Sequence, residues 1–397
     1  MLSFSIGRNE PEFIHEIIEW VNSILVNKTY FQVAQYPVGI ESRVQDVKSL
    51  LDIEKNDTTC MVGIIGTGGI GKTTIAKAIY NIIASQFKGS CFLENIRETS
   101  SQKGLVHLQN KLLSKILGDS SSMVDNDDQG ITLIKKRLRL MRVLLVLDDV
   151  DQSVQLEKLV GKGDWFGLGS RIILTTRDEN LLGADGVYLP YRMNVLDYNE
   201  ALRLFSWNAF KSEKPPDDFV ELTEYVIGYA GGLPLALVVL GSDLSGKDLY
   251  EWKSALDRYK TIPNKKIQEI LRISYDGLED TVKDIFLDIA CFFKGEKVGY
   301  VSKILDKCGF FPDHGIKVLV DKSLISIDKD FETLIMNDLL QEVGREIVRQ
   351  ESPKEPGKRS RLWFHEDVRH VLEGNTVRLM LKIIYNLHLF LFHMLIY

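Results

Sequence analysis

Cysteine is scarce in this sequence of 397 residues, and its pattern excludes two common uses of the thiol. The four cysteines form no CxxC pair and have no spacing with histidine that is typical of a metal site. Cys60 and Cys91 lie in apolar stretches, where a reduced, buried thiol is expected instead of a disulfide. We therefore expect a reducing, cytoplasmic compartment and a fold that does not depend on disulfides.

An excess of positive charge is also missing. Forty-nine lysines and arginines face 55 aspartates and glutamates, so the formal net charge is −6. A chain of this charge has no general electrostatic attraction to nucleic acid or to anionic membranes, and we expect neither as a partner. The amino terminus lacks the charged start and apolar run of a signal peptide. No leucine-rich repeat and no repeat period of 20–30 residues is found.

The carboxyl-terminal stretch Val377–Tyr397 is the only part of the chain that raises the question of a membrane. It is long enough to span a bilayer, but Arg378 and Lys382 lie within it. Each charged side chain costs a few kcal/mol at the bilayer centre. We therefore favour a buried helix, or the unnatural end of a truncated reading frame, over a membrane span.

Apolar periodicity divides the chain into a strand-rich part and a helical part. Cys60–Ile65, Val143–Leu147 and Arg171–Thr175 are continuous apolar runs, typical of strands buried on both faces. Helical stretches alternate with them, which predicts a parallel sheet with right-handed crossovers. From about Asn199 helices dominate, and Val318–Val348 has the size of a winged helix. The length fits two to four domains.

One segment matches a phosphate-binding pattern completely: Gly66–Thr73 has the form GxxxxGK[ST]. Its glycines allow backbone N–H groups to turn toward phosphate oxygens, and the following helix adds a favourable dipole. Lys72 supplies charge for the β- and γ-phosphates, and the Thr73 hydroxyl completes a Mg²⁺ shell. A strand before the loop and a helix after it favour this site over a plain glycine-rich turn. The loop residues expected to bind the nucleotide are Gly66, Gly68, Gly69, Ile70, Gly71, Lys72, Thr73 and Thr74.

Two carboxylates, Asp148 and Asp149, end the apolar strand Val143–Leu147. This places them at the carboxyl edge of the sheet, where α/β proteins bind ligands. Asp148 is expected to hold Mg²⁺ through water, and Asp149 to orient or deprotonate the attacking water. Taken alone, the pair fits a helix cap equally well. The phosphate-binding loop upstream makes the metal role the better hypothesis.

Arg177 follows the strand Arg171–Thr175, where a guanidinium could read the γ-phosphate of ATP. Without the other motifs, a plain surface arginine would be the better interpretation. Gly231–Leu235 breaks one helix and starts another, and Pro234 by itself indicates ordinary capping.

Together these segments resemble the NB-ARC module of plant intracellular immune receptors, in the STAND class of NTPases. The resemblance runs from about Tyr36 to Gly374 and includes, in family order, YPVGIESRV, GTGGIGKTT, FKGSCFLENIRE, VLLVLDDVD, WFGLGSRIILTTRD, GGLPLAL, FLDIACFFKG, LIMNDLL and EPGKRSRLWFHEDV. Two details resemble the subclass with a TIR domain: Asp151 stands where others have tryptophan, and one helix reads FLDIACFF.

The resemblance implies three parts in a fixed order. We expect an α/β P-loop NTPase domain with a parallel sheet at 38–195, a helical bundle at 196–278 and a winged helix at 279–374. A residual TIR-type helix and linker would occupy 1–37, and an apolar tail of unknown role 375–397. We expect most of the TIR domain and the leucine-rich repeats of the family to be missing.

The resemblance also implies further nucleotide contacts. Val38 and Gly39 would flank the adenine, while Pro234 and Leu235 would close the pocket from the helical bundle. Asn337 stands where the family's Met-His-Asp motif has histidine, a residue that lies near the β-phosphate of ADP.

In the family, ADP holds a closed, silent state, and exchange for ATP opens it to oligomerise and signal in defence. The sequence therefore predicts an ADP/ATP-binding, Mg²⁺-dependent switch of plant innate immunity with slow ATPase activity. It would act by self-association or with full-length immune receptors. The alternative is a nucleotide-gated winged-helix DNA-binding regulator. Its only support is the basic cluster Lys354, Lys358, Arg359 and Arg361, which a solvated face explains more simply.

Overall fold

The computed structural model describes residues 30–118, 123–183, 188–261 and 264–373. The helix and most of the linker expected within 1–37, and the tail expected at 375–397, lie outside these ranges. The chain forms two compact units. Among the described residues, the first unit contains 30–63, 73–175 and 188–189, and the second contains 64–72, 176–183 and 190–373.

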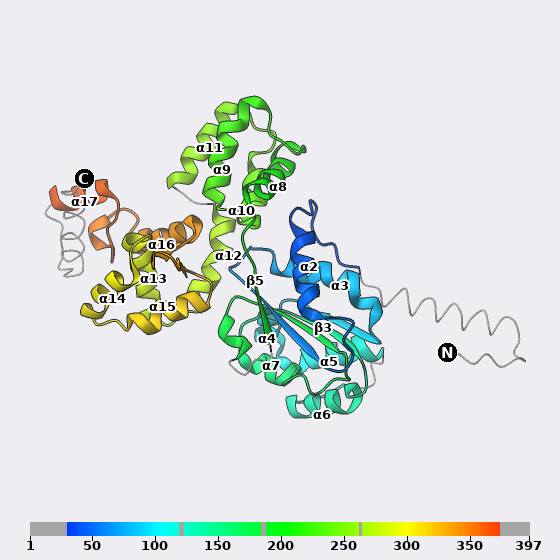
Figure 1. The fold of residues 1–397 in the computed structure, drawn as a ribbon. Coiled ribbons are helices and arrows are strands. Elements are labelled where there is room, and N and C mark those ends of the chain that lie inside the picture. Colours follow the sequence, from blue (N-terminus) through cyan, green and yellow to red (C-terminus); the bar gives the residue numbers. More distant parts are fainter. Residues whose placement is uncertain (1–29, 119–122, 184–187, 262–263, 374–397) are drawn as a thin grey trace, which may run out of the picture. The chain divides into compact units, whose positions relative to one another are not determined.

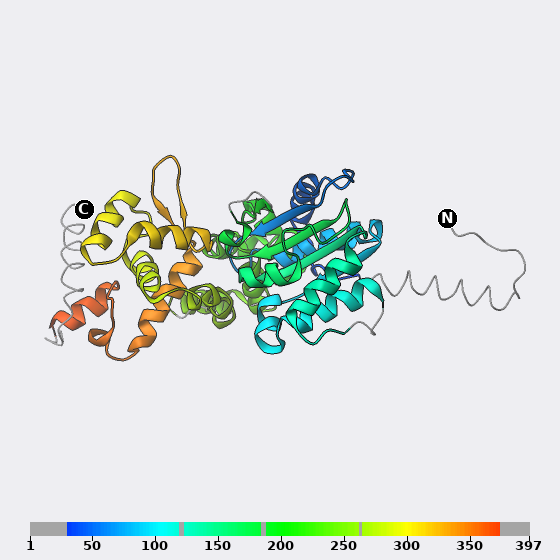
Figure 2. The ribbon, with the colours of Figure 1, turned by 90° about the horizontal axis from the view of Figure 1, so that it is seen from below.

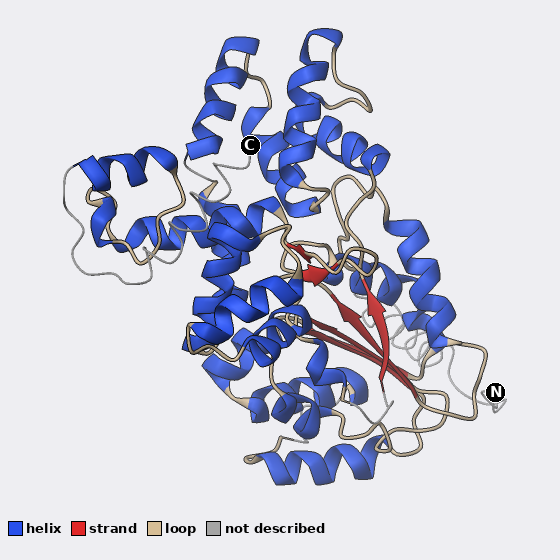
Figure 3. Cartoon of the chain, turned by 60° about the vertical axis from the view of Figure 1, so that its left-hand side comes forward, coloured by secondary structure: helices blue, strands red, loops and turns tan. Residues whose placement is uncertain are grey.

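A five-stranded parallel sheet, in the order β2-β3-β4-β1-β5, is the framework of the α/β part of the chain. Its strands are β1 Cys60–Ile65, β2 Gly89–Leu93, β3 Val143–Val150, β4 Arg171–Thr176 and β5 Tyr188–Arg192. β2 pairs with β3 in parallel, with Gly89 opposite Val143 and Leu93 opposite Leu147. Nearly every residue of β3 and β4 is buried, which is why both read as continuous apolar runs. The predicted parallel sheet is confirmed, and Figure 3 shows its strands in red among the helices.

The helices of this region are amphipathic and begin and end at clear signals. They are α2 Ile40–Leu51, α3 Lys72–Ile83, α4 Ile96–Lys103, α5 Leu105–Leu117, α6 Asp127–Leu138 and α7 Ser153–Leu159. Gly104, with φ 79°, separates α4 from α5. The Asn126 side chain caps α6 by accepting from the Gln129 N–H. In α5, Leu108, Leu112 and Ile116 share one buried face.

The second unit is almost entirely helical (Figure 1). Its helices are α8 Tyr198–Phe210, α9 Val220–Ala230, α10 Pro234–Leu244, α11 Leu249–Thr261, α12 Lys265–Asp276, α13 Asp280–Asp288, α14 Val298–Lys307, α15 Pro312–Asp321, α16 Asp338–Glu351 and α17 His365–Glu373. Trp252 of α11 is the centre of an aromatic core, because its ring lies 5.3 Å from that of Phe210 and 5.0 Å from that of Phe219. The bundle α8–α11 closes around these rings.

A two-stranded hairpin accompanies α13–α16 and gives this part the form of a winged helix. β6 Ser326–Ile327 and β7 Leu334–Ile335 pair antiparallel, and Figure 2 shows the hairpin standing out from the helices. α12 contacts both α10 and α16, so it connects the bundle with the winged helix. The helical region and the winged helix predicted from the sequence are both present. No helix of the described ranges is long and apolar enough to cross a membrane.

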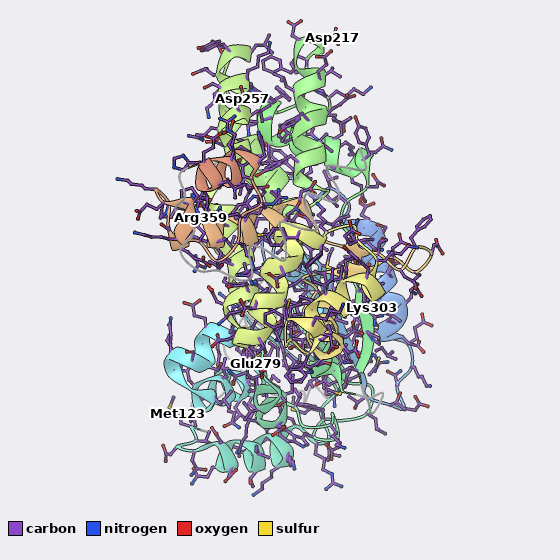
Figure 4. All side chains as sticks on the ribbon, turned by 90° about the vertical axis from the view of Figure 1, so that its left-hand side faces the viewer. Met123, Asp217, Asp257, Glu279, Lys303 and Arg359 are labelled. Carbon is purple, nitrogen blue, oxygen red and sulfur yellow. The ribbon has the colours of Figure 1, made fainter. Side chains whose placement is uncertain are left out.

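The basic cluster considered for DNA binding is not a basic surface. Arg361 is buried and bonds to Asp284 and Asp288 of α13, at 2.9 and 2.6 Å. Arg359, labelled in Figure 4, is also buried and pairs with Asp367 at 2.7 Å. Arg361 thus fastens the segment after α16 to α13, and Arg359 fastens it to α17. Only the two lysines of the cluster are exposed, so the observation behind the DNA-binding alternative is lost.

Candidate nucleotide-binding site

The glycine loop between β1 and α3 has the backbone that phosphate binding requires. Gly69 and Gly71 have φ values of 80° and 103°, which L-amino acids with side chains rarely adopt. The Lys72 side chain is 7% exposed, and its Nζ donates to the carbonyls of Gly66 at 2.7 Å and Thr67 at 2.9 Å. The lysine thus lies over its own loop, with its charge beside the place where phosphate oxygens are expected.

Arg177 lies against this loop and is not an isolated surface arginine. A Cβ added to Gly68 would be 2.9 Å from Arg177 Nη1. The same nitrogen donates to the Ile270 carbonyl at 3.1 Å and to Ser274 Oγ at 3.3 Å, both in α12. The next residue, Asp178, forms a 2.7 Å ion pair with Lys322, directly after α15. The expected γ-phosphate sensor is therefore in contact with the loop and with α12, and its neighbour is tied to the winged helix.

The turn before α10 reaches the loop from the helical bundle. Pro234 is the first residue of α10, and the Leu235 N–H donates to the Gly69 carbonyl at 3.1 Å. A Cβ on Gly69 would lie 2.7 Å from the Leu235 Cβ, so only glycine fits there. The structure thus places Leu235 in contact with the phosphate loop.

Asn337 has two neighbours that the sequence did not indicate. Its Oδ1 accepts from the Leu339 N–H at 2.9 Å, which makes Asn337 the N-cap of α16. Its Nδ2 lies 2.6 Å from where a Cβ on Gly231 would stand, and Gly231 begins the turn that leads to α10. Asn337 therefore packs the winged helix against the turn that carries Leu235.

A second group of predicted residues lies within the first unit, at the end of β3. Asp148 is 1% exposed, and its Oδ1 accepts from Thr73 Oγ1 at 2.8 Å. The same oxygen accepts from Thr175 Oγ1 at 2.7 Å. A buried carboxylate beside a threonine hydroxyl is a set of hard oxygen ligands that suits Mg²⁺. The residues present therefore fit the metal that the sequence predicted.

Asp149 has a left-handed backbone, with φ 57°, which separates its side chain from that of Asp148. Its N–H donates to Thr175 Oγ1 at 2.9 Å, and its carboxylate pairs with Arg97 of α4 at 3.0 Å. The helix-cap alternative is wrong, because α7 begins four residues later and Gln152 is its cap. Sequence reasoning missed Thr175 and Arg97, although both lie in motifs that were recognised.

α2 carries the residues expected beside the adenine at its amino terminus. Gly39, with φ 69°, is the N-cap position, and the Val38 N–H donates to the Tyr36 carbonyl at 2.9 Å. The opposite end of α2 is held by Arg171, the first residue of β4.

The Arg171 guanidinium is buried among backbone carbonyls. It donates to those of Leu51 at 2.5 Å and Thr58 at 3.0 Å, and further to those of Ser170, Asp52 and Lys55. Burial lowers the pKa of Arg171. This one side chain therefore fixes the turn after α2 against the sheet.

Two features define this chain as a P-loop nucleotide-binding protein. Lys72 bonds to carbonyls of its own glycine loop, and the buried carboxylate of Asp148 bonds to the Thr73 hydroxyl. Comparison with known families specifies the kind. Residues 40–215 match the NB-ARC domain, and residues 279–352 match the winged-helix domain of Roq1-like disease resistance proteins. The chain belongs to the family of NB-ARC modules of plant disease resistance proteins, as the motifs predicted.

Two similar proteins show how much of a relative the chain represents. It is 47% identical to disease resistance protein RUN1 of Vitis rotundifolia over 327 residues, which cover 82% of this chain and 24% of RUN1. It is 41% identical to TMV resistance protein N of Nicotiana glutinosa over 376 residues, covering 93% of this chain and 32% of that protein. The chain thus spans a third or less of the length of these two relatives.

A solved structure shows the fold. A Walker-type ATPase of Pyrococcus abyssi superimposes with a TM-score of 0.52 at 16% identity, over 77% of this chain and 95% of that one.

Proposed function

We propose that this chain is an adenine-nucleotide switch of plant disease resistance, silent with ADP and active with ATP. The observation that carries the proposal is the set of contacts on the glycine loop. Gly68 meets Arg177, and Gly69 meets Leu235, so a strand end and the helical bundle both touch the loop. The disease resistance proteins that the chain resembles support the biological setting. We assign the domains to 38–195, 196–278 and 279–374, and the compartment to the cytoplasm.

Phosphate binding follows from the loop. Backbone N–H groups of Gly66–Thr74 would surround the phosphates, and Lys72 would exchange its two carbonyl acceptors for phosphate oxygens. Thr73 and Asp148 would hold Mg²⁺, which supplies charge neutralisation at the phosphates. Val38 and Gly39 would lie beside the adenine.

Switching follows from the partners of Arg177. In this structure the guanidinium donates to α12, and Asp178 pairs with Lys322 of the winged helix. A γ-phosphate would compete with the Ile270 carbonyl and Ser274 for the same guanidinium. Only ATP has a γ-phosphate that can accept from Arg177, so the two nucleotides would favour different states of the chain, as a two-state switch requires. Self-association, or association with full-length receptors, would follow opening.

Hydrolysis is assigned to Asp149, which would orient or deprotonate the attacking water. We expect it to be slow, as befits a switch and not a metabolic enzyme.

The proposal is tested by the nucleotide that the purified chain retains. Mild purification followed by denaturation and chromatography should release ADP. Lys72→Ala should lose it, since each hydrogen bond from this charged group is worth ~1.5–3 kcal/mol. Lys77→Ala, which removes a half-buried charge from the same helix, is the matched control and should retain ADP. A wild-type chain that releases no adenine nucleotide contradicts the proposal.

A further inference from the structure

We propose that Arg97 restrains Asp149 and thereby keeps nucleotide hydrolysis slow. The proposal rests on the function proposed above and adds a residue that acts on hydrolysis through Asp149. Arg97 is therefore a positioning residue, and its effect belongs to the rate of hydrolysis and not to nucleotide affinity.

The loop between β2 and α4 is built to aim Arg97. Asn95 is the N-cap of α4 and has φ 52°, a left-handed conformation that turns the chain between Glu94 and the first turn of α4, which carries Arg97. Glu94 pairs with Lys77 of α3 at 2.7 Å, and Arg97 pairs with Asp149 at 3.0 Å. The loop is thus fixed on one side to the helix that follows the phosphate loop. The first turn of α4, which carries Arg97, is fixed to the carboxylate at the end of β3.

Asp149 is held from its backbone as well as its side chain. Its N–H donates to Thr175 Oγ1, whose own hydroxyl hydrogen goes to Asp148. With the backbone fixed in this way, the Asp149 carboxylate pairs with Arg97, and the Asp148 carboxylate accepts from Thr73. The two neighbouring carboxylates therefore serve different partners.

The ion pair competes with the reaction. In hydrolysis the water oxygen bonds to the γ-phosphorus as the bond to the β–γ bridging oxygen breaks and ADP leaves with its electron pair. Asp149 accepts the water proton and passes it to the released phosphate. A carboxylate oxygen that already accepts from a guanidinium is a weaker acceptor toward water. The side chains are 29% and 21% exposed, and ion pairs near the surface shift an equilibrium by about 1.4- to 5-fold. Removing Arg97 should raise the rate by a factor in this range.

The kinetic test compares three variants of the whole chain with Mg²⁺ and ATP. Arg97→Gln should raise kcat about 1.4- to 5-fold and leave KM unchanged, while Arg97→Lys should restore the slow rate. Glu94→Gln breaks the neighbouring ion pair on the same loop without touching Asp149, and should leave kcat unchanged. A kcat for Arg97→Gln that is equal to or below that of the wild type overturns the proposal. An equal rise in Glu94→Gln also overturns it, because loosening of the loop would then be the cause.

A second measurement needs no nucleotide. Urea unfolding of the wild type, Arg97→Gln, Asp149→Asn and the double variant gives the coupling between the two side chains. Asparagine tolerates the left-handed backbone at this position. We expect a coupling of about 1.4- to 5-fold in the unfolding equilibrium, and strictly additive effects overturn the ion pair. A measured coupling without a change in kcat would confirm the ion pair but overturn the proposal that it slows hydrolysis. A wild type that retains no nucleotide overturns the proposed function instead, and with it the reaction that Arg97 would restrain.

Discussion

Replacing Asn337 should separate two effects of its side chain, one on the release of ADP and one on the stability of α16. The resemblance to the family implies that the histidine at this position lies near the β-phosphate of ADP. Asparagine is shorter and cannot become positively charged. A hydrogen bond contributes about 0.5–1.5 kcal/mol, so Asn337→His should slow ADP release by about 2- to 13-fold. The structure adds the opposite effect on stability. Asn337 Oδ1 caps α16 through Leu339, and histidine is a poor cap.

Loss of that cap should cost about 1 kcal/mol, or roughly 4–8 °C in the unfolding temperature of a domain of about 100 residues. Asn337→His should therefore release ADP more slowly and melt earlier when nucleotide is absent. Asn337→Asp is the matched control, because it keeps the acceptor for the Leu339 N–H but offers no donor to phosphate. It should release ADP faster without melting earlier.

Release is followed by displacement of a fluorescent ADP analogue, and melting by calorimetry of the nucleotide-free chain. Equal release rates for the native protein and Asn337→His would refute the reasoning, since the short amide would then serve the phosphate as well as histidine. Unchanged melting of Asn337→His would refute the capping role.

Two further predictions concern the loop and the thiols. Gly69→Ala should weaken ADP binding in a calorimetric titration, because its Cβ would meet the Leu235 Cβ at 2.7 Å and because φ 80° disfavours alanine. Gly104→Ala is the control for backbone strain alone, since a Cβ there would meet no atom within 4 Å. Equal ADP affinities for the two variants would contradict the contact with Leu235. Burial raises the pKa of Cys91 and of Cys291 to about 12, so both thiols should stay protonated and unreactive toward a thiol reagent at pH 8. The exposed thiol of Cys308 should react rapidly with the same reagent. Rapid labelling of Cys91 or Cys291 in the folded chain would contradict this prediction.

The parts of the fold that the sequence predicted are the strands whose residues are apolar because both faces of the strand are buried. β3 and β4 are buried on both faces, so their runs of valine, leucine and isoleucine indicate strands directly. β5 was not predicted, because it is a partly exposed edge strand that contains Pro190. α6 was not predicted either, because its polar first turn reads as the continuation of a loop.

The candidate site divides in the same way. The glycine loop and the strand-end aspartates are local patterns, and the structure places them as the motifs indicated. Arg97 and Thr175 matter only through their contacts with Asp149 and Asp148, which lie 52 and 27 positions away in the chain. No local pattern reports such contacts. The same holds for Arg359 and Arg361, whose burial the sequence does not reveal because their partners are tertiary.

Arg171 has a consequence for the order in which the chain acquires its structure. The carbonyls of Leu51 and Thr58 receive their donors from a residue 120 and 113 positions further along the chain. During synthesis these carbonyls must stay bonded to water until β4 has been made and added to the sheet. α2 is therefore among the first described elements to be translated, but its carboxyl-terminal turn can be completed only after about a hundred more residues have followed.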